Sequence, residues 1–170
     1  MLEFTGLPAD EVNFSYIKLM HESGAGLLGN SLPLPSHELQ SALIQAAHNH
    51  GLITIAHALT QKDTMAILAA GVDGLAHSFC DEAPGDGLLA AYRKNNSFLI
   101  PTLVVSATLT GGEKQSTERF AQHPLFGKLL DENGKSCYCG RLMMCKEGSS
   151  SEYSYQIVRM LHRGGIDIVA

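Results

Sequence analysis

The sequence predicts an α/β protein built on a parallel sheet, and three observations support this fold class. Five short apolar runs rich in β-forming residues recur along the 170 residues. The segments between them have the apolar periodicity of helices and capping residues at their ends. The composition, with 45% hydrophobic and 17% charged residues, is that of an ordinary globular domain. Regular alternation of strand and helix is the βαβ pattern, which places the strands in parallel.

The expected strands are nearly continuous in apolar residues, as is typical of strands buried on both faces of a parallel sheet. An alternating pattern would instead indicate strands with one face in solvent. We therefore interpret all five as buried strands. They occupy residues 14–20, 52–58, 72–79, 97–105 and 166–170.

The expected helices carry recognisable end signals. Ser36 is the predicted N-cap of a helix at 37–50, and Thr60 is that of a helix at 61–70. Asp63 stands at the capping-box position of the second helix. Two further helical patterns occupy residues 84–96 and 151–165.

The length fits one domain, residues 1–170, with residues 106–149 as an excursion inside it. This segment is polar, contains glycines and is interrupted by Pro124. A long excursion after a strand is more often a lid or a side wall than a separate domain. We interpret residues 106–149 as an insertion or lid with one or two helices.

Four cysteines are present, and three of them, Cys137, Cys139 and Cys145, have the spacing C-x-C-x5-C within the insertion. This spacing lacks the C-x2-C pairs of structural zinc sites and is a weak metal signal. Together with Cys80, these residues are interpreted as structural thiols or part of a half-buried lid. Nothing else indicates a secreted disulfide framework.

Charge and hydropathy disfavour two classes of partner. The net charge is −5, and no cluster of lysine and arginine is available to neutralise nucleic-acid phosphates. The first residues have neither a basic segment nor an apolar core of a signal peptide, and no apolar run approaches the roughly 18 residues that span a bilayer. We expect no nucleic-acid partner, no membrane association and a cytoplasmic location.

Three titratable residues, Lys18, His57 and His77, stand at or near the carboxyl ends of three expected strands. Functional groups of parallel α/β proteins collect at these ends, so the three side chains converge on one rim if the strands are neighbours. Neutral imidazole is the commonest metal ligand, which predicts a divalent metal, with zinc as the first choice. A single histidine at a strand end is more often a hydrogen-bonded core residue, but two on consecutive units favour a site.

Lys18 lies between apolar neighbours, so its ammonium would have to lose water or lose its proton. Snorkelling to the rim is one interpretation. The functional alternatives are a Schiff-base nucleophile and a modified lysine acting as an anionic ligand. His21, Glu22 and Ser23 follow in the loop directly beyond Lys18 and are candidates for substrate contact at the same rim.

The order of the segments YIKLMHESG, ITIAHALT, GVDGLAHSF, FLIPTL and GGIDIVA resembles the metal-dependent amidohydrolase superfamily, particularly its imidazolonepropionase-like and prolidase-like branch. The resemblance covers residues 14–105 and 155–170. It implies a partial (β/α)8 TIM-type barrel, roughly strands four to eight with their helices. It also implies that Lys18 carries a carbamate that bridges two metals, usually zinc, and that His57 and His77 are the fifth-strand and sixth-strand ligands.

The family pattern is incomplete in this chain. The first-strand His-x-His pair does not occur, and the sequence stops at Ala170, before the aspartate expected after the eighth strand, so no catalytic residue is identified. The resemblance implies hydrolysis of a carbon–nitrogen bond in a small amide, a cyclic amide or a dipeptide-like substrate, with the truncated chain inactive alone. Open barrel edges predict self-association or pairing with the missing barrel half. A non-catalytic interaction fragment and a Schiff-base lyase that uses Lys18 are the alternatives.

Overall fold

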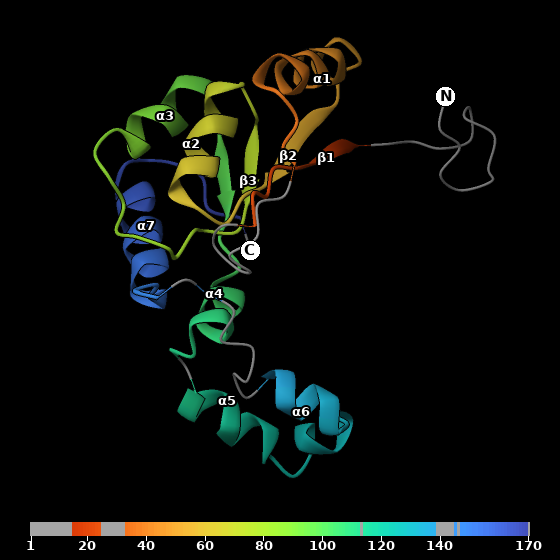
Figure 1. Ribbon diagram of the computed structural model, residues 1–170, viewed down its shortest axis with the longest axis vertical. Coiled ribbons are helices and arrows are strands. Elements are labelled where there is room, and N and C mark those ends of the chain that lie inside the picture. The colour runs from red at the N-terminus through yellow and green to blue at the C-terminus, as the bar shows by residue number, and fades with distance from the viewer. Residues whose placement is uncertain (1–14, 25–32, 113, 139–144, 146, 170) are drawn as a thin grey trace, which may run out of the picture.

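A computed structural model of the protein describes residues 15–24, 33–112, 114–138, 145 and 147–169. Its centre is a four-stranded sheet with the order β1-β2-β3-β4 and parallel pairing throughout (Figure 1). The predicted α/β class with a parallel sheet is confirmed. The strands are β1 (Tyr16–Met20), β2 (Ile53–His57), β3 (Gly74–Ala76) and β4 (Phe98–Ile100).

The helices that connect the strands begin at the predicted caps. The Ser36 hydroxyl accepts a hydrogen bond from the Leu39 amide at 3.2 Å, and the Thr60 hydroxyl accepts one from the Asp63 amide at 3.0 Å. Ser150 caps the last helix by accepting from the Glu152 amide. The helices are α1 (His37–Asn49), α2 (Gln61–Ala69), α3 (Leu88–Asn95), α4 (Leu103–Thr110), α5 (Lys114–Ala121), the short 3-10 helix η1 (Phe126–Leu129), α6 (Glu132–Tyr138) and α7 (Ser151–Arg163).

The fifth expected strand, at residues 166–170, is present as a single parallel bridge between Leu99 and Ile168. The Leu99 amide donates to the Asp167 carbonyl at 3.0 Å, and the Val169 amide donates to the Leu99 carbonyl at 2.9 Å. These bonds place residues 167–169 beside β4. The four strands and this segment therefore lie side by side in the order of the sequence, as strands do in a (β/α) barrel.

The sheet buries one face against helices and leaves much of the other face open. On the buried face, Ala56, Leu75 and Leu99 are fully inaccessible to solvent. They belong to a core that includes these residues of the surrounding helices: Ile67, Leu68, Tyr92, Ile157 and Leu161.

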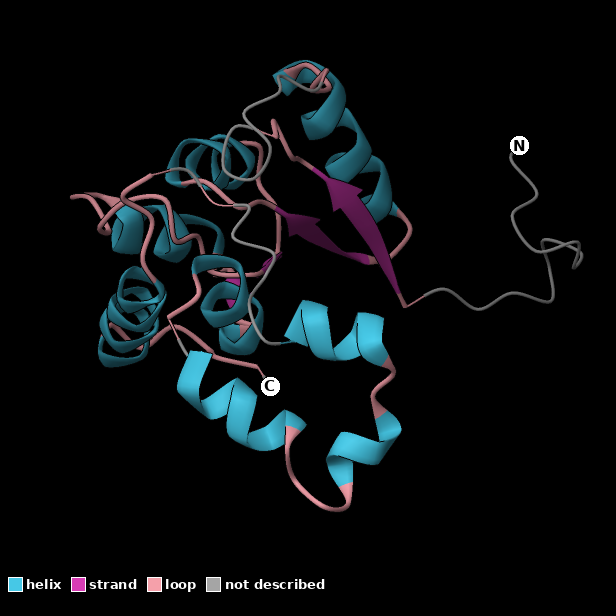
Figure 2. Ribbon diagram, turned by 60° about the horizontal axis from the view of Figure 1, so that its bottom comes forward, coloured by secondary structure: helices cyan, strands magenta, loops and turns pink. Residues whose placement is uncertain are grey.

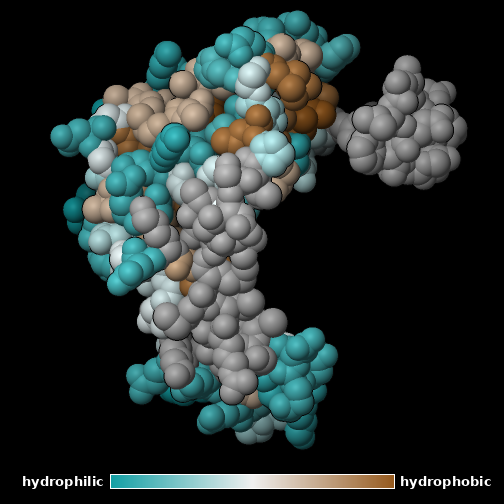
Figure 3. Space-filling model, in the orientation of Figure 1, coloured by the Kyte–Doolittle hydropathy of each residue, from teal (hydrophilic) through white to brown (hydrophobic). Residues whose placement is uncertain are grey.

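The interpretation of residues 14–20 as a fully buried strand is wrong. Tyr16 is 51% exposed and Met20 is 61% exposed, and Lys18 between them is exposed as well. The physical reason is that β1 is an edge strand whose alternate side chains point to the open face of the sheet. In Figure 3, hydrophobic side chains gather beside α1, near the edge of the sheet that β1 forms.

The expected strand at 97–105 is too long at its carboxyl end. β4 ends at Ile100, and residues 103–110 form α4 instead. Pro101 has no amide hydrogen to donate to a neighbouring strand, and Thr102 adopts a left-handed backbone with φ of 46°. The turn at these two residues ends the strand and redirects the chain into a helix.

Helices α5 and α6 project away from the sheet (Figures 1 and 2), and α5 packs against η1 and α6. These elements make up most of the expected excursion at 106–149, whose role as an insertion or lid stays a prediction. In the part of the chain that the structure describes, no helix has the length and apolar character needed to cross a membrane.

Candidate functional site

The register of the sheet places Lys18 and His57 on the same face. Lys18 pairs with Ile55, and Met20 pairs with His57. Paired residues of parallel strands point to the same face, and residues two apart on one strand do so as well. Lys18 and His57 therefore share the open face of the sheet, with His57 at the carboxyl end of its strand.

His77 follows β3 directly and is held from two sides. Its amide donates to the Ile100 carbonyl at 2.8 Å, and its ring Nδ1 lies 2.5 Å from the Thr102 hydroxyl. Its φ of 79° is uncommon for a residue with a side chain. The Thr102 contact engages Nδ1 of the ring, so a metal ion would bind this histidine through Nε2.

The rings of His57 and His77 meet at the strand ends. Their centroids lie 4.8 Å apart with an interplanar angle of 77°. The two predicted ligand candidates that come from consecutive strands are therefore side by side in the structure, and Lys18 lies near enough to influence both electrostatically.

The electrostatics of this cluster favour neutral imidazoles. Burial lowers the pKa of His77 to about 4, with further lowering from His57 and from the Lys18 ammonium. Burial also lowers the pKa of His57, although Glu22 opposes the shift. Partial burial lowers the pKa of Lys18. Both shifts favour the uncharged imidazole, which is the form that binds a metal ion.

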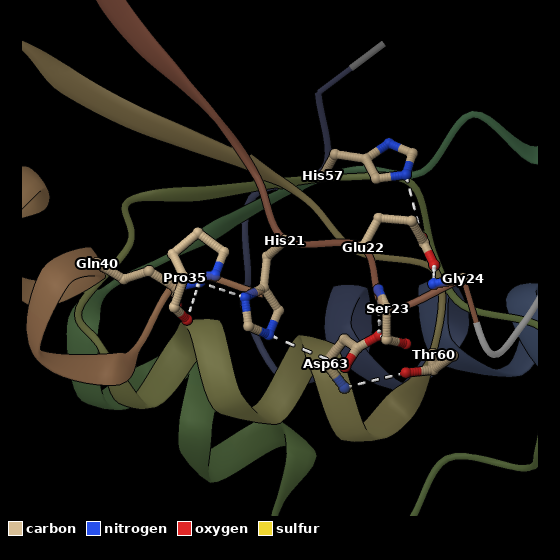
Figure 4. A network of polar contacts seen from close by, with 9 residues as sticks. All are labelled: His21, Glu22, Ser23, Gly24, Pro35, Gln40, His57, Thr60 and Asp63. Carbon is tan, nitrogen blue, oxygen red and sulfur yellow. Dashed lines mark hydrogen bonds and ion pairs between the residues drawn. The ribbon is translucent and has the colours of Figure 1, made fainter. Parts of the chain in front are cut away.

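Glu22 is the residue of the β1–α1 loop that faces this cluster. Its Oε2 lies 3.2 Å from His57 Nε2, and its Oε1 accepts a hydrogen bond from the Gly24 amide at 2.7 Å (Figure 4). The loop is held in register with β2 because the His21 amide donates to the His57 carbonyl at 3.0 Å. The loop therefore presents a carboxylate directly to one of the two histidines.

The side chains of His21 and Ser23 point away from His57, into the space between α1 and α2 (Figure 4). The His21 ring is 5% exposed, with Nδ1 2.5 Å from the Gln40 side-chain amide and Nε2 3.9 Å from Asp63 Oδ1. Asp63 Oδ2 accepts from the Ser23 hydroxyl at 2.5 Å and from the Ser23 amide at 3.3 Å. Substrate contact by His21, Glu22 and Ser23 stays a prediction, and these bonds show that two of the three anchor the loop.

Three residues of the site carried no clear signal in the sequence. The apolar run at 97–105 places Thr102 inside an expected strand, and Gln40 is one polar residue among several on an expected helix. The position of Asp63 in the sequence indicates helix capping, and its backbone amide does bond to Thr60, but its carboxylate binds the loop after β1.

The donors fit part of a metal site. Within the described ranges, no three histidine, cysteine, aspartate or glutamate side chains form a group that could hold a metal ion. The two imidazoles at one rim are donors that a divalent ion can use, and they are fewer than the three protein ligands of a catalytic zinc site. The Cys139 thiol and the Cys137 side chain lie outside the described residues, so the C-x-C-x5-C spacing adds nothing to this centre.

No family model matches the sequence, and no curated protein matches it. The structure is similar to several solved ones. A Xaa-Pro dipeptidase with bound methionine in its active site is 18% identical, with a TM-score of 0.53, and the match covers 91% of this chain and 33% of that one. A putative prolidase from Bifidobacterium longum is 21% identical, with a TM-score of 0.53 and coverage of 89% and 33%. An ochratoxinase from A. niger is 15% identical, with a TM-score of 0.58 and coverage of 91% and 30%.

The chain spans about a third of the length of these structures. The likeness concerns the fold. The parallel sheet and its helices correspond to a part of each larger structure. The predicted fold, an α/β chain that forms part of a larger barrel, is confirmed.

Proposed function

We propose that this chain, whose fold is that of part of an amidohydrolase-superfamily barrel, supplies three ligands to the metal centre of a cytoplasmic hydrolase. The hydrolase would cleave a carbon–nitrogen bond in a small amide, a cyclic amide or a dipeptide-like substrate. The observation that carries the proposal is the meeting of the His57 and His77 rings at 4.8 Å, with Lys18 on the same face of the sheet. Similarity to a prolidase and a Xaa-Pro dipeptidase supports the class of bond.

The contacts of each residue suggest its role. His77 would bind through Nε2, because its Nδ1 is engaged by Thr102, and such a second contact fixes the orientation of a metal-binding imidazole. His57 would bind beside it, and Glu22 would orient the His57 ring. A divalent metal, zinc in the first place, supplies a water of lowered pKa and polarises the scissile carbonyl when it is bound.

Lys18 fits this centre better as a carbamate than as an ammonium. An ammonium near two metal-binding rings repels a cation, whereas a carbamate is anionic and attracts it. Carbamate formation requires the neutral amine, and partial burial lowers the pKa of Lys18 in the favourable direction. The same lowered pKa supports the alternative function of a Schiff-base lyase, in which the Lys18 amine attacks a carbonyl.

The chain purified with zinc and bicarbonate is expected to retain metal, and the His57→Ala/His77→Ala variant is expected to retain about tenfold less or lower. The measurement is inductively coupled plasma mass spectrometry on the size-purified chain. His50→Ala, at an exposed position, is the matched control and should retain the wild-type amount.

Equal metal in the wild type and the double variant would refute the metal centre. Borohydride trapping of a carbonyl compound on Lys18, abolished in Lys18→Arg, would then favour the lyase. Failure to trap any carbonyl compound would exclude the lyase.

The partner of the open sheet face is part of the same proposal. The edge strand β1 exposes Tyr16 and Met20, and Ile53 beside them on β2 is 45% exposed. Exposed apolar side chains on an unpaired edge strand favour pairing with another chain. We propose that a second copy of the chain, or the remaining portion of a barrel, covers this face.

We expect the average mass of the chain to rise with concentration in sedimentation velocity. Met20→Glu/Ile53→Glu should shift the chain toward the monomer, because two charges replace the apolar contacts. Leu125→Glu, a control at a residue 71% exposed and far from the sheet, should leave the association unchanged. A wild-type chain that stays monomeric at all concentrations would contradict the proposal.

A further inference from the structure

Two cysteines that are 65 residues apart in sequence meet outside the metal centre. The Sγ atoms of Cys80 and Cys145 lie 3.8 Å apart. Cys80 is 6% exposed in the loop after β3, and Cys145 is half-buried near the end of the excursion at 106–149. The two thiols are in van der Waals contact, and a disulfide would need them to approach by about 2 Å more.

Hydrogen bonds from both ends of the excursion hold the loop that carries Cys80. The Ser106 hydroxyl, on α4, donates to the Ser78 carbonyl at 3.3 Å. The Ser150 amide donates to the Cys80 carbonyl at 2.9 Å, and the Ser154 hydroxyl of α7 donates to the Phe79 carbonyl at 2.8 Å. The chain therefore leaves and returns at the same loop, so Cys145 is brought to Cys80 by a bonded framework.

The surroundings shift the pKa values of the two thiols in opposite directions. A hydrogen bond from Cys80 lowers the pKa of Cys145, against the opposing effect of burial. The same contact, together with burial and Asp81, raises the pKa of Cys80. Cys145 is thus the more accessible thiol and the better nucleophile, and Cys80 is the buried second thiol beside it.

We propose that Cys80 and Cys145 form a reversible disulfide bond by exchange with a small disulfide such as oxidised glutathione. The Cys145 thiolate attacks one sulfur of glutathione disulfide and releases the first glutathione as a thiolate. Cys80 gives its proton to a departing glutathione, and its thiolate attacks the Cys145 sulfur and displaces the second glutathione. Both protein thiols are oxidised, and one glutathione disulfide is reduced to two glutathiones.

The bond would fasten the end of the excursion to the loop that begins at His77. It would close a long loop of the unfolded chain, and long closed loops give the larger stabilisation in chain-entropy terms. Disulfides that form in reducing surroundings are usually transient and act in catalysis or redox sensing. The oxidised state would therefore add a covalent link to the hydrogen bonds that already join the two ends of the excursion to this loop, and the reduced state would keep the hydrogen bonds alone.

The test uses the full chain incubated with glutathione disulfide, then blocked with an alkylating reagent and digested with trypsin without reduction. Trypsin places Cys145 in residues 142–146, separately from Cys137 and Cys139 in residues 136–141. We expect a linked peptide that joins residues 142–146 to residues 63–93, and a loss of about 2 Da from the intact mass. The melting temperature should rise by roughly 5–10 °C and return on reduction.

Two variants control the assignment. Cys145→Ser should retain the fold by circular dichroism, lose the linked peptide and show no rise in melting temperature. Cys137→Ser/Cys139→Ser should keep both. A linkage that uses residues 136–141, no linkage at all, or metal bound by the pair without a loss of mass would each overturn the proposal.

Discussion

Replacing Leu75 by alanine is expected to lower the free energy of unfolding by about 2–5 kcal/mol. Leu75 lies at the centre of β3, is fully inaccessible to solvent and belongs to the core between the sheet and its helices. The truncation removes apolar burial and leaves a cavity, because neighbours on a paired central strand cannot close around it. Urea denaturation followed by circular dichroism gives the free energy.

Leu129→Ala is the matched control, because it makes the same chemical change at a side chain that is 80% exposed. Its effect should be within about 0.5 kcal/mol. The comparison should be made at low protein concentration, since association through the open face would add to the apparent stability. A Leu75→Ala variant as stable as the wild type would mean that the buried face of the sheet is not the core.

The sequence was sufficient for features that depend on local interactions. Ser36 and Thr60 act within their own helices, so spacing along the chain located both caps. The strand-end rule also brought His57 and His77 to one rim, because parallel neighbours end on the same side of a sheet.

The sequence does not predict features that depend on contacts between residues far apart in the chain. An apolar run looks the same in a central strand and at an edge, so the exposure of Tyr16 and Met20 could not be read from residues 14–20. The end of β4 was missed because valines at 104 and 105 favour a strand locally, whereas the turn at Pro101 and Thr102 decides the outcome. Lys18 is accordingly less buried than its neighbours suggested.

The contacts among His21, Gln40 and Asp63 at the site could not be predicted from the sequence for the same reason. Gln40 is 19 residues from His21, and Ser23 is 40 residues from Asp63, so no local pattern records these contacts. Taken singly, each residue type is ordinary at its position in the sequence. Only the packing of α1 and α2 over the loop shows that a buried carboxylate holds the loop in place.

Asp63→Ala is expected to lower the free energy of unfolding by about 2–4 kcal/mol. The carboxylate of Asp63, a residue that is 2% exposed, accepts two hydrogen bonds from Ser23. Its removal takes this acceptor away from the Ser23 donors and also removes the charge that lies 3.9 Å from the buried His21 Nε2. Urea denaturation measures the total effect. Hydrogen exchange of the amides at 21–24 measures the local effect, which should be a selective loss of protection.

Asp63→Asn separates the carboxylate charge from the acceptor. It keeps one oxygen that can accept from Ser23, so it should cost less than the alanine variant and protect residues 21–24 better. If both variants leave these amides as protected as in the wild type, the network does not position the loop.

If the loop loosens, Glu22 should move away from His57, because the loop that carries its carboxylate is held by Asp63. Metal retention should then fall in Asp63→Ala although no metal-binding side chain has been changed, which would link a buried contact between helices to the rim where the chemistry is proposed.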